Sequence, residues 1–181
     1  MSVPAVEPTP LAGVFVIVAQ RVEDERGWFA RVYDEAVFAA HGLCTSFPQH
    51  GEAHNPRRGT VRGLHFQTDP HAQAKLVRCE RGALYDVVVD LRPESPTYGA
   101  WYGLELRAEA PRALYVPAGF AHGYQTLEDA TDVHYLTSSP YVAAASGGIA
   151  YDSPALAIPW PVGDAIVAPK DAALPVFERR R

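Results

Sequence analysis

Titratable and basic side chains gather between Gly59 and Lys75 of this 181-residue chain. His65 stands between two apolar neighbours in the sequence RGLHFQ, with Arg62 shortly before it. An imidazole can exchange a proton near neutral pH, and the two cations can hold an anion. On a regular strand, Arg62 would face one way and His65 the other. A lone histidine here is as often a core residue bonded to backbone, but its basic companions and a later histidine favour a site.

The later histidine, His122, lies in the sequence YVPAGFAHGYQ. Pro117, Gly119 and His122 form a P-x-G-x-x-H pattern, in which proline and glycine shape a tight turn that delivers a histidine onto the next strand. Cupin jelly rolls use such a turn to point a histidine into their barrel, and metal-binding cupins add an H-x-H pair. Here that place reads HFQ from His65, so one ligand is missing and we expect no metal. The alternative is a metal-dependent cupin oxygenase or isomerase with His65 and His122 as ligands.

Short strands are expected to position these side chains. Many segments are rich in β-branched or aromatic residues and are bounded by glycine, proline or charged residues, which is typical of strands. Two stretches are expected to be helical: Asp34–His41, which begins with a capping aspartate, and the weaker tail Asp171–Arg181, which Pro175 interrupts. We therefore predict an all-β, cupin-type jelly-roll sandwich or barrel with a few short peripheral helices and a cavity lined by polar residues. The expected strands are Val14–Val18, Leu84–Val89, Trp101–Leu106, Ala113–Val116 and Asp132–Leu136.

Composition argues against several classes of function. The length suits one domain, which we expect to span residues 1–181. A net charge of -5 argues against a nucleic-acid-binding protein, although it allows a local basic pocket. Cys44 and Cys79 have no metal-type or redox-type spacing and are expected to be free and buried. With no secretory pattern at the N-terminus and no apolar run near the ~20 residues of a membrane helix, we expect a cytoplasmic, soluble protein without a membrane partner.

Together, the sequence motifs resemble those of the dTDP-4-dehydrorhamnose 3,5-epimerases and their relatives in deoxysugar biosynthesis. RGLHFQ combined with PAGFAHG at this separation is a specific signal, whereas either piece alone would be weak. The resemblance covers nearly the whole chain in order. Its segments are DERGWFARVY (24–33), GTVRGLHFQ (59–67), QAKLV (73–77), YDVVVDLRPESPTYG (85–99), VPAGFAHGYQTL (116–127), HYLTSSPY (134–141), IPWP (158–161) and APKD (168–171).

The resemblance implies an epimerase without cofactor or metal, which acts at C3, C5 or both of a nucleotide-linked 4-keto-6-deoxyhexose, with dTDP as the expected nucleotide. A C–H beside a ketone is weakly acidic because its anion spreads onto the carbonyl oxygen as an enolate. Such an enzyme needs a base, a cation or hydrogen-bond donor at the oxygen, and an acid on the opposite face. By resemblance, His65 is the base and Asp171 orients it. Lys75 lies near the C4 oxygen, and Tyr135 donates the proton, with Tyr141 as the structural alternative.

The resemblance also implies a set of substrate-binding residues. Arg26 and Arg62 match family arginines, and a guanidinium suits bidentate contacts with a diphosphate. Gln49, His122 and Lys170 match other positions that contact substrate. Relatives of this kind are dimers in which strands and N-terminal segments exchange, so we expect a homodimer.

Four positions depart from the family pattern. Where relatives have Q-x-N-x-S, this chain reads QHGEA from Gln49, so that Gly51 and Ala53 replace asparagine and serine. Arg31 and Ser146 stand where glutamates are expected. In relatives these positions contact the nucleotide or the sugar. The departures therefore bear on which sugar and which ring carbons are used, because the proton-transfer residues are all present.

Two other functions are consistent with the same scaffold. A sugar 3,4-ketoisomerase also shuttles protons through an enediol, but the presence of Tyr135 together with Lys75 favours an epimerase. A non-catalytic module that binds a sugar nucleotide is disfavoured, because base, acid and enolate stabiliser are retained together.

Overall fold

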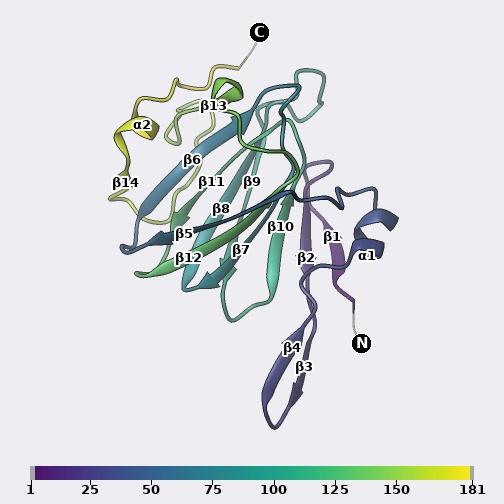
Figure 1. The fold of residues 1–181 in the computed structure, drawn as a ribbon. Helices are drawn as coiled ribbons and strands as arrows, with labels where there is room; N and C mark the ends of the chain where they lie inside the picture. Colours follow the sequence, from purple (N-terminus) through teal and green to yellow (C-terminus); the bar gives the residue numbers. More distant parts are fainter. Residues whose placement is uncertain (1–2, 180–181) are drawn as a thin grey trace.

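Two β-sheets face each other in the computed structural model, which describes residues 3–179 (Figure 1). The first sheet contains, in spatial order, β1 (Ala5–Pro8), β2 (Phe15–Val18), β10 (Arg112–Val116), β7 (Lys75–Arg81), β12 (Thr131–Thr137) and β5 (Gln49–Asn55). The second contains β13 (Ser146–Gly148), β6 (Thr60–Gln67), β11 (Phe120–Thr126), β8 (Ala83–Asp90) and β9 (Trp101–Arg107), with the short β14 (Ile166–Val167) parallel beside β6. Strands β3 (Arg21–Asp24) and β4 (Gly27–Ala30) form a separate hairpin. The helices are α1 (Glu35–Ala40), α2 (Pro169–Ala172) and the 3₁₀ turn Ala143–Ala145.

Apolar side chains fill part of the space between the two sheets. Because successive residues of a strand point to opposite faces, each strand contributes every second residue to this interior. Val77 and Leu114 of the first sheet meet Leu84, Val88 and Phe120 of the second in one buried cluster. A second cluster packs α1 onto the outer face of the first sheet, and a third covers the outer face of the second sheet with the C-terminal segment. The interior beside β5, β6 and β12 is left open.

The predicted fold is confirmed: the chain is an all-β sandwich of the cupin jelly-roll type, and each expected strand is found within one or two residues. Helix α1 is also confirmed, with the Asp34 side chain accepting a hydrogen bond from the Val37 N–H. The predicted tail helix Asp171–Arg181 is wrong. Helix α2 begins earlier, at Pro169, whose fixed φ suits the first helical position. It ends before Pro175, which cannot donate a helical hydrogen bond, and residues 180–181 lie outside the described part.

Two further expectations concern the cysteines and the membrane. Cys44 and Cys79 are both free, as predicted; Cys79 is buried, whereas Cys44 is only half-buried, so the expected burial is wrong for Cys44. No helix within residues 3–179 has the length and apolar character needed to cross a bilayer.

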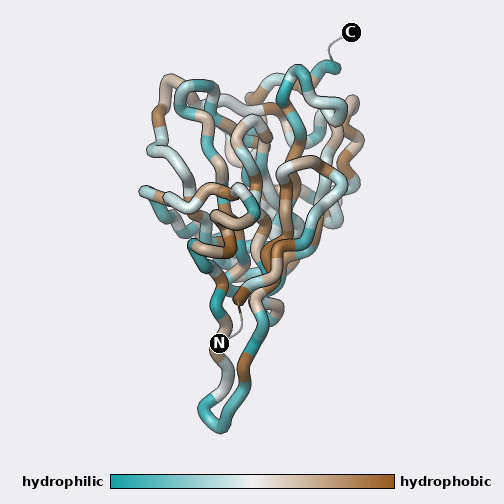
Figure 2. The backbone as a smooth tube through the Cα atoms, turned by 90° about the vertical axis from the view of Figure 1, so that its right-hand side faces the viewer, coloured by the Kyte–Doolittle hydropathy of each residue, from teal (hydrophilic) through white to brown (hydrophobic). Residues whose placement is uncertain are grey.

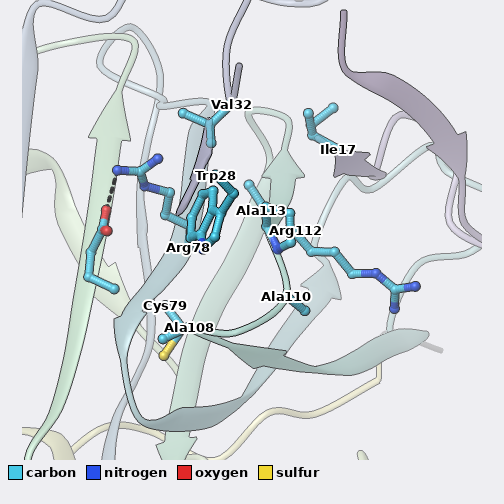
Figure 3. Close-up of a pocket in the computed structure, with 11 residues that line it drawn as sticks. Ile17, Trp28, Val32, Arg78, Cys79, Ala108, Ala110, Arg112 and Ala113 are labelled. Carbon is cyan, nitrogen blue, oxygen red and sulfur yellow. Dashed lines mark ion pairs between the residues drawn. The ribbon is translucent and has the colours of Figure 1, made fainter. Parts of the chain in front are cut away.

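The β3–β4 hairpin projects away from the sandwich (Figures 1 and 2). Three apolar residues on it are more than half exposed: Val22, Trp28 and Phe29. Its tip is hydrophilic, as Figure 2 shows, and carries an ion pair between Arg26 and Asp24. A cavity of about 60 Å³ lies beneath Trp28 and is lined by Arg78, Cys79 and Ala113 among others (Figure 3). Its volume admits a few water molecules and no sugar.

Strand β6, which carries His65, contains a β-bulge that corrects the expected facing of two side chains. On the neighbouring β11, His122 pairs with His65, whereas Tyr124 pairs with Arg62. Between these two pairs the chain advances three residues along β6 but only two along β11, so β6 has one extra residue. The extra residue reverses the alternation of side chains. Arg62 and His65 therefore line the same cavity, although strict alternation predicts opposite faces.

The bulge predicts a severe effect of a side chain at Gly63. Gly63 has φ +133°, and a Cβ there would lie 2.5 Å from the Cα of Gly123. We expect Gly63→Ala to lower the free energy of unfolding by about 2–4 kcal/mol, from backbone strain and overpacking together. Urea denaturation measures the change. Gly163→Ala is the matched control, because an added Cβ there meets no atom within 4 Å. Equal losses in both variants would contradict the prediction.

Candidate active site

An open cavity of about 1060 Å³ lies between the sheets. Its walls come from β5, β7 and β12 of the first sheet, from β6 and β11 of the second, and from the segment 166–174 that contains α2. This volume is at the upper end of the range of small-molecule sites, so it can hold a ligand larger than one sugar ring. Eight of the nine predicted site residues line it: Gln49, Arg62, His65, Lys75, His122, Tyr135, Lys170 and Asp171. The ninth, Arg26, does not.

His65 and Asp171 form a hydrogen-bonded pair at the second-sheet wall of the cavity. His65 Nε2 lies 2.9 Å from Asp171 Oδ1, and Asp171 Oδ2 accepts a hydrogen bond from the Gly63 backbone N–H at 3.1 Å. The Asp171 side chain is only 3% exposed, whereas His65 is 38% exposed. A carboxylate can only accept, so Nε2 carries the proton. In the neutral ring the lone pair that can take a proton is therefore on Nδ1.

The surroundings of His65 favour its neutral form. Burial lowers the pKa of His65, because it disfavours the charged imidazolium. The hydrogen bond and negative charge of Asp171 oppose this shift, while the positive charges of Lys75 and Lys170 add to it. The net effect is a pKa below the usual value for histidine. At neutral pH the ring is thus available as a base.

Lys75 lies at the start of β7, where it pairs with Thr137 of β12. Burial lowers the pKa of its ammonium to about 8, and the negative charge of Asp86 partly opposes that shift. The ammonium form still predominates at pH 7. Lys75 is therefore a cation at neutral pH that loses its charge as the pH rises past about 8.

Asp86 is a functional candidate that the sequence analysis did not identify. It is fully buried in β8, and its Oδ1 lies 2.6 Å from Nε2 of His122. Its Oδ2 has no hydrogen-bond partner among the residues that the structure describes. A signal was present in the sequence, because Asp86 interrupts the apolar strand LYDVVV. A carboxylate in such a run requires a specific partner, since burying a charge alone is costly.

Tyr135 lies on the opposite wall of the cavity from His65. It belongs to β12 of the first sheet, whereas His65 belongs to β6 of the second. Its side chain is partly exposed into the cavity. Tyr141, the alternative to Tyr135, also lines the cavity, and its backbone N–H donates a hydrogen bond of 2.8 Å to Gln49 Oε1. The position of Tyr141 is thereby linked to that of Gln49.

Arg62 is held in place by Asn55. The Nε of Arg62 donates to Asn55 Oδ1 at 2.8 Å, and one terminal nitrogen donates to the His54 carbonyl at 3.3 Å. Asn55 is fully buried, and its amide donates to the carbonyls of Ala53 and Thr131. The guanidinium therefore enters the cavity wall in a defined orientation, as recognition of an anion by paired N–H groups requires.

Arg26 is not part of this cavity. Its side chain is 83% exposed at the tip of the β3–β4 hairpin, where it is paired with Asp24. Arg26 therefore does not reach the cavity of its own chain, because the hairpin points away from the sandwich (Figure 1). Its role in binding substrate stays a prediction.

The four departures from the family pattern separate into two groups. Gly51, Ala53 and Ser146 line the cavity. Arg31 lies outside its lining and forms an ion pair of 2.9 Å with Asp34, which caps α1. Three of the four positions at which the resemblance implies a different residue therefore lie in the cavity wall.

Two of the three histidines that line the cavity, His65 and His122, are each hydrogen-bonded to a carboxylate. His65 and His122 pair across β6 and β11, yet each directs its Nε2 to an aspartate of its own. Within residues 3–179, no group of three or more histidine, cysteine, aspartate or glutamate side chains is arranged to hold a metal ion.

Comparisons with known proteins show to which family the chain is similar. The chain is 44% identical over 166 residues to the dTDP-4-dehydrorhamnose 3,5-epimerase of Sinorhizobium fredii, covering 91% of this chain and 85% of that protein. It is 41% identical over 165 residues to the dTDP-4-dehydrorhamnose 3-epimerase of Streptomyces niveus, covering 91% and 79%. A crystal structure of the 3,5-epimerase of Bacillus anthracis with TDP and PPi bound superposes with a TM-score of 0.94 at 40% identity, over 97% of this chain and 100% of that one.

The family model described as dTDP-4-dehydrorhamnose 3,5-epimerase matches residues 8–179. It includes both cavity walls, the segment carrying α2 and the projecting hairpin. The chain therefore belongs to the dTDP-4-dehydrorhamnose 3,5-epimerase family, whose members are isomerases that act as carbohydrate epimerases.

Proposed function

We propose that this protein epimerises C3, C5 or both of a dTDP-linked 4-keto-6-deoxyhexose by transferring protons beside the C4 ketone. The observation that carries the proposal is the pairing of His65 with the buried Asp171 in the same cavity as Lys75 and Tyr135. The names of the relatives support the same substrate class.

In this mechanism, Nδ1 of His65 removes the proton from a ring carbon next to the ketone. The C–H electron pair moves into the ring bond, and the carbonyl electrons move onto the C4 oxygen as an enolate. The ammonium of Lys75 stabilises that developing negative charge. Asp171 stabilises the imidazolium that forms and keeps the ring in the required tautomer.

Inversion requires that the new proton arrive from the face opposite to the base. His65 and Tyr135 belong to different sheets, and a sugar ring held between the sheets would present one face to each. Tyr135 donates its hydroxyl proton to the carbon and recovers one from solvent, to which it is partly exposed. This placement supports an epimerase over a module that only binds sugar nucleotides.

Cationic and polar residues account for the nucleotide diphosphate. Arg62, which Asn55 orients, provides N–H groups for phosphate oxygens. Lys170, His122 and Gln49 line the same cavity and contact the substrate. The TDP and PPi bound in the Bacillus anthracis structure support this class of ligand.

We further propose that the protein is a homodimer in which Arg26 of one protomer reaches the cavity of its partner. Arg26 matches a substrate-contacting position, yet it lies on a hairpin that leaves its own sandwich (Figure 1). The exposed Val22, Trp28 and Phe29 of that hairpin favour burial against a second copy. A two-fold axis would then exchange both hairpins.

Three expectations from the sequence stay predictions: one domain spanning residues 1–181, a cytoplasmic location, and catalysis without cofactor or metal. No nucleic-acid or membrane partner is proposed.

The first prediction from this mechanism concerns the base. In D₂O with dTDP-4-keto-6-deoxyglucose, we expect His65→Ala to abolish deuterium uptake at C3 and C5, measured by NMR. Asp171→Asn should lower the uptake rate by on the order of 10²–10⁴-fold, because the ring loses its orienting charge. Circular dichroism would show that both variants remain folded. Full deuterium uptake in His65→Ala would remove His65 from this role.

The second prediction concerns pH. The rate should rise with pH through the lowered pKa of His65, since the base must be neutral. It should fall as pH passes about 8, where Lys75 loses its proton. Measurement of kcat/KM against pH tests this bell shape. In Lys75→Arg, whose guanidinium stays protonated, the alkaline limb should move well above pH 8 at a reduced rate. An unchanged alkaline limb would assign it to another group.

The third prediction concerns the dimer. Arg26→Ala and His65→Ala should each be weakly active or inactive alone. After the two are mixed, unfolded and refolded together, half of the dimers would be hybrids with one intact site, giving about one quarter of wild-type activity. No recovery, or a monomer in light scattering, would contradict the exchange of hairpins.

A further inference from the structure

A glycine lies directly beneath the ring of Tyr135. Gly51 on β5 pairs with Tyr135 on β12. A Cβ at position 51 would lie 2.6 Å from Cζ, 2.7 Å from the hydroxyl oxygen and 2.8 Å from Cε2 of that ring. Carbon atoms in contact are normally about 3.5–4.0 Å apart. The ring therefore occupies the space that a side chain at position 51 would fill.

The Tyr135 hydroxyl makes no hydrogen bond to any of residues 3–179, and the residue is 36% exposed. No hydrogen bond therefore fixes the phenol, and the β5 backbone at Gly51 limits how closely the ring can approach that strand.

We infer that Gly51 is a positioning residue: by leaving room for the ring, it sets where the Tyr135 hydroxyl lies and so how often a ring carbon is reprotonated with inversion. The inference rests on the proposed function, in which Tyr135 is the acid. It also gives a physical consequence to the glycine that stands where the resemblance implies asparagine. A misplacement of about 1 Å between reacting groups can lower a rate about 10²-fold.

A methyl group at position 51 should move the ring without unfolding the protein. The φ angle of Gly51 lies outside the positive region, so alanine is compatible with its backbone. The atoms that the new Cβ would meet are at the far end of a partly exposed side chain, which can swing into the cavity. Gly51→Ala therefore tests position separately from stability.

Two measurements in D₂O, deuterium uptake and inversion, distinguish the role of the base from that of the acid. If His65 removes a proton, exchanges it with solvent and returns deuterium to the same face, the carbon is labelled without inversion. Inversion additionally requires Tyr135. In Gly51→Ala, we expect the ratio of inversion to total deuterium uptake on dTDP-4-keto-6-deoxyglucose to fall about 10-fold or more. A loss of folded protein would lower both rates together and leave the ratio unchanged.

Gly103→Ala is the matched control. A Cβ at Gly103 would lie 2.4 Å from the hydroxyl oxygen of Tyr85, the same clash between a glycine and a tyrosine, but outside the cavity lining. This variant should keep the wild-type ratio. In Tyr135→Phe inversion should already be lost, so adding Gly51→Ala to that variant should change the remaining deuterium uptake by less than about twofold, because His65 is untouched and the hydroxyl that Gly51→Ala misplaces is already absent.

Each outcome bears on one claim. An unchanged ratio in Gly51→Ala, or a large loss of deuterium uptake when Gly51→Ala is added to Tyr135→Phe, would overturn the role of Gly51. Absence of both uptake and inversion in the wild-type protein would instead overturn the proposed function. A fall in the ratio for Gly51→Ala and not for Gly103→Ala would support the inference.

Discussion

The site depends most on the two hydrogen bonds that the Asp171 carboxylate makes to β6. One oxygen accepts from the His65 ring and the other from the Gly63 backbone, so a single buried group binds both a side chain and the strand that carries it. Loss of either bond would leave a charged oxygen buried without a partner, which costs more than an ordinary hydrogen bond contributes. The same contact therefore docks α2 onto the sandwich, completes the cavity wall and fixes the tautomer of the base.

Burial shifts the pKa values of two cavity residues in the same direction. It lowers the pKa of His65 and that of Lys75, because a partly dry site disfavours both cations. Each cation has a carboxylate that limits the shift: Asp171 for His65 and Asp86 for Lys75. One group is thereby neutral and the other charged at the same pH, as proton abstraction beside a stabilised enolate requires. The net charge of -5 is irrelevant to this local arrangement.

The residues of the site could be predicted from the sequence more completely than their positions in the structure. Strands such as Leu84–Val89 could be predicted because β-branched side chains act locally, and eight of nine site residues do share one cavity. The sequence could not predict that Arg62 and His65 point into the same cavity, because the bulge between them depends on how β6 pairs with β11. That Arg26 lies outside the cavity of its own chain could not be predicted, because similarity along a sequence carries no information on the direction in which a hairpin projects. Asp86 was missed although its place in an apolar strand was a usable signal.

Empty space in the cavity wall shapes this site as much as side chains do. Alternate residues of facing strands all point inward, so each large residue limits where its neighbours can lie. Gly51 leaves room for the Tyr135 ring, and Gly147 does the same for Phe66, whose Cζ would lie 2.9 Å from an added Cβ. Exchanging such small residues can move a ring while base, orienting carboxylate and cation stay in place. Relatives named as 3,5-epimerase and as 3-epimerase match this chain almost equally well. We therefore expect the choice of ring carbon to depend on the wall residues rather than on the proton-transfer groups.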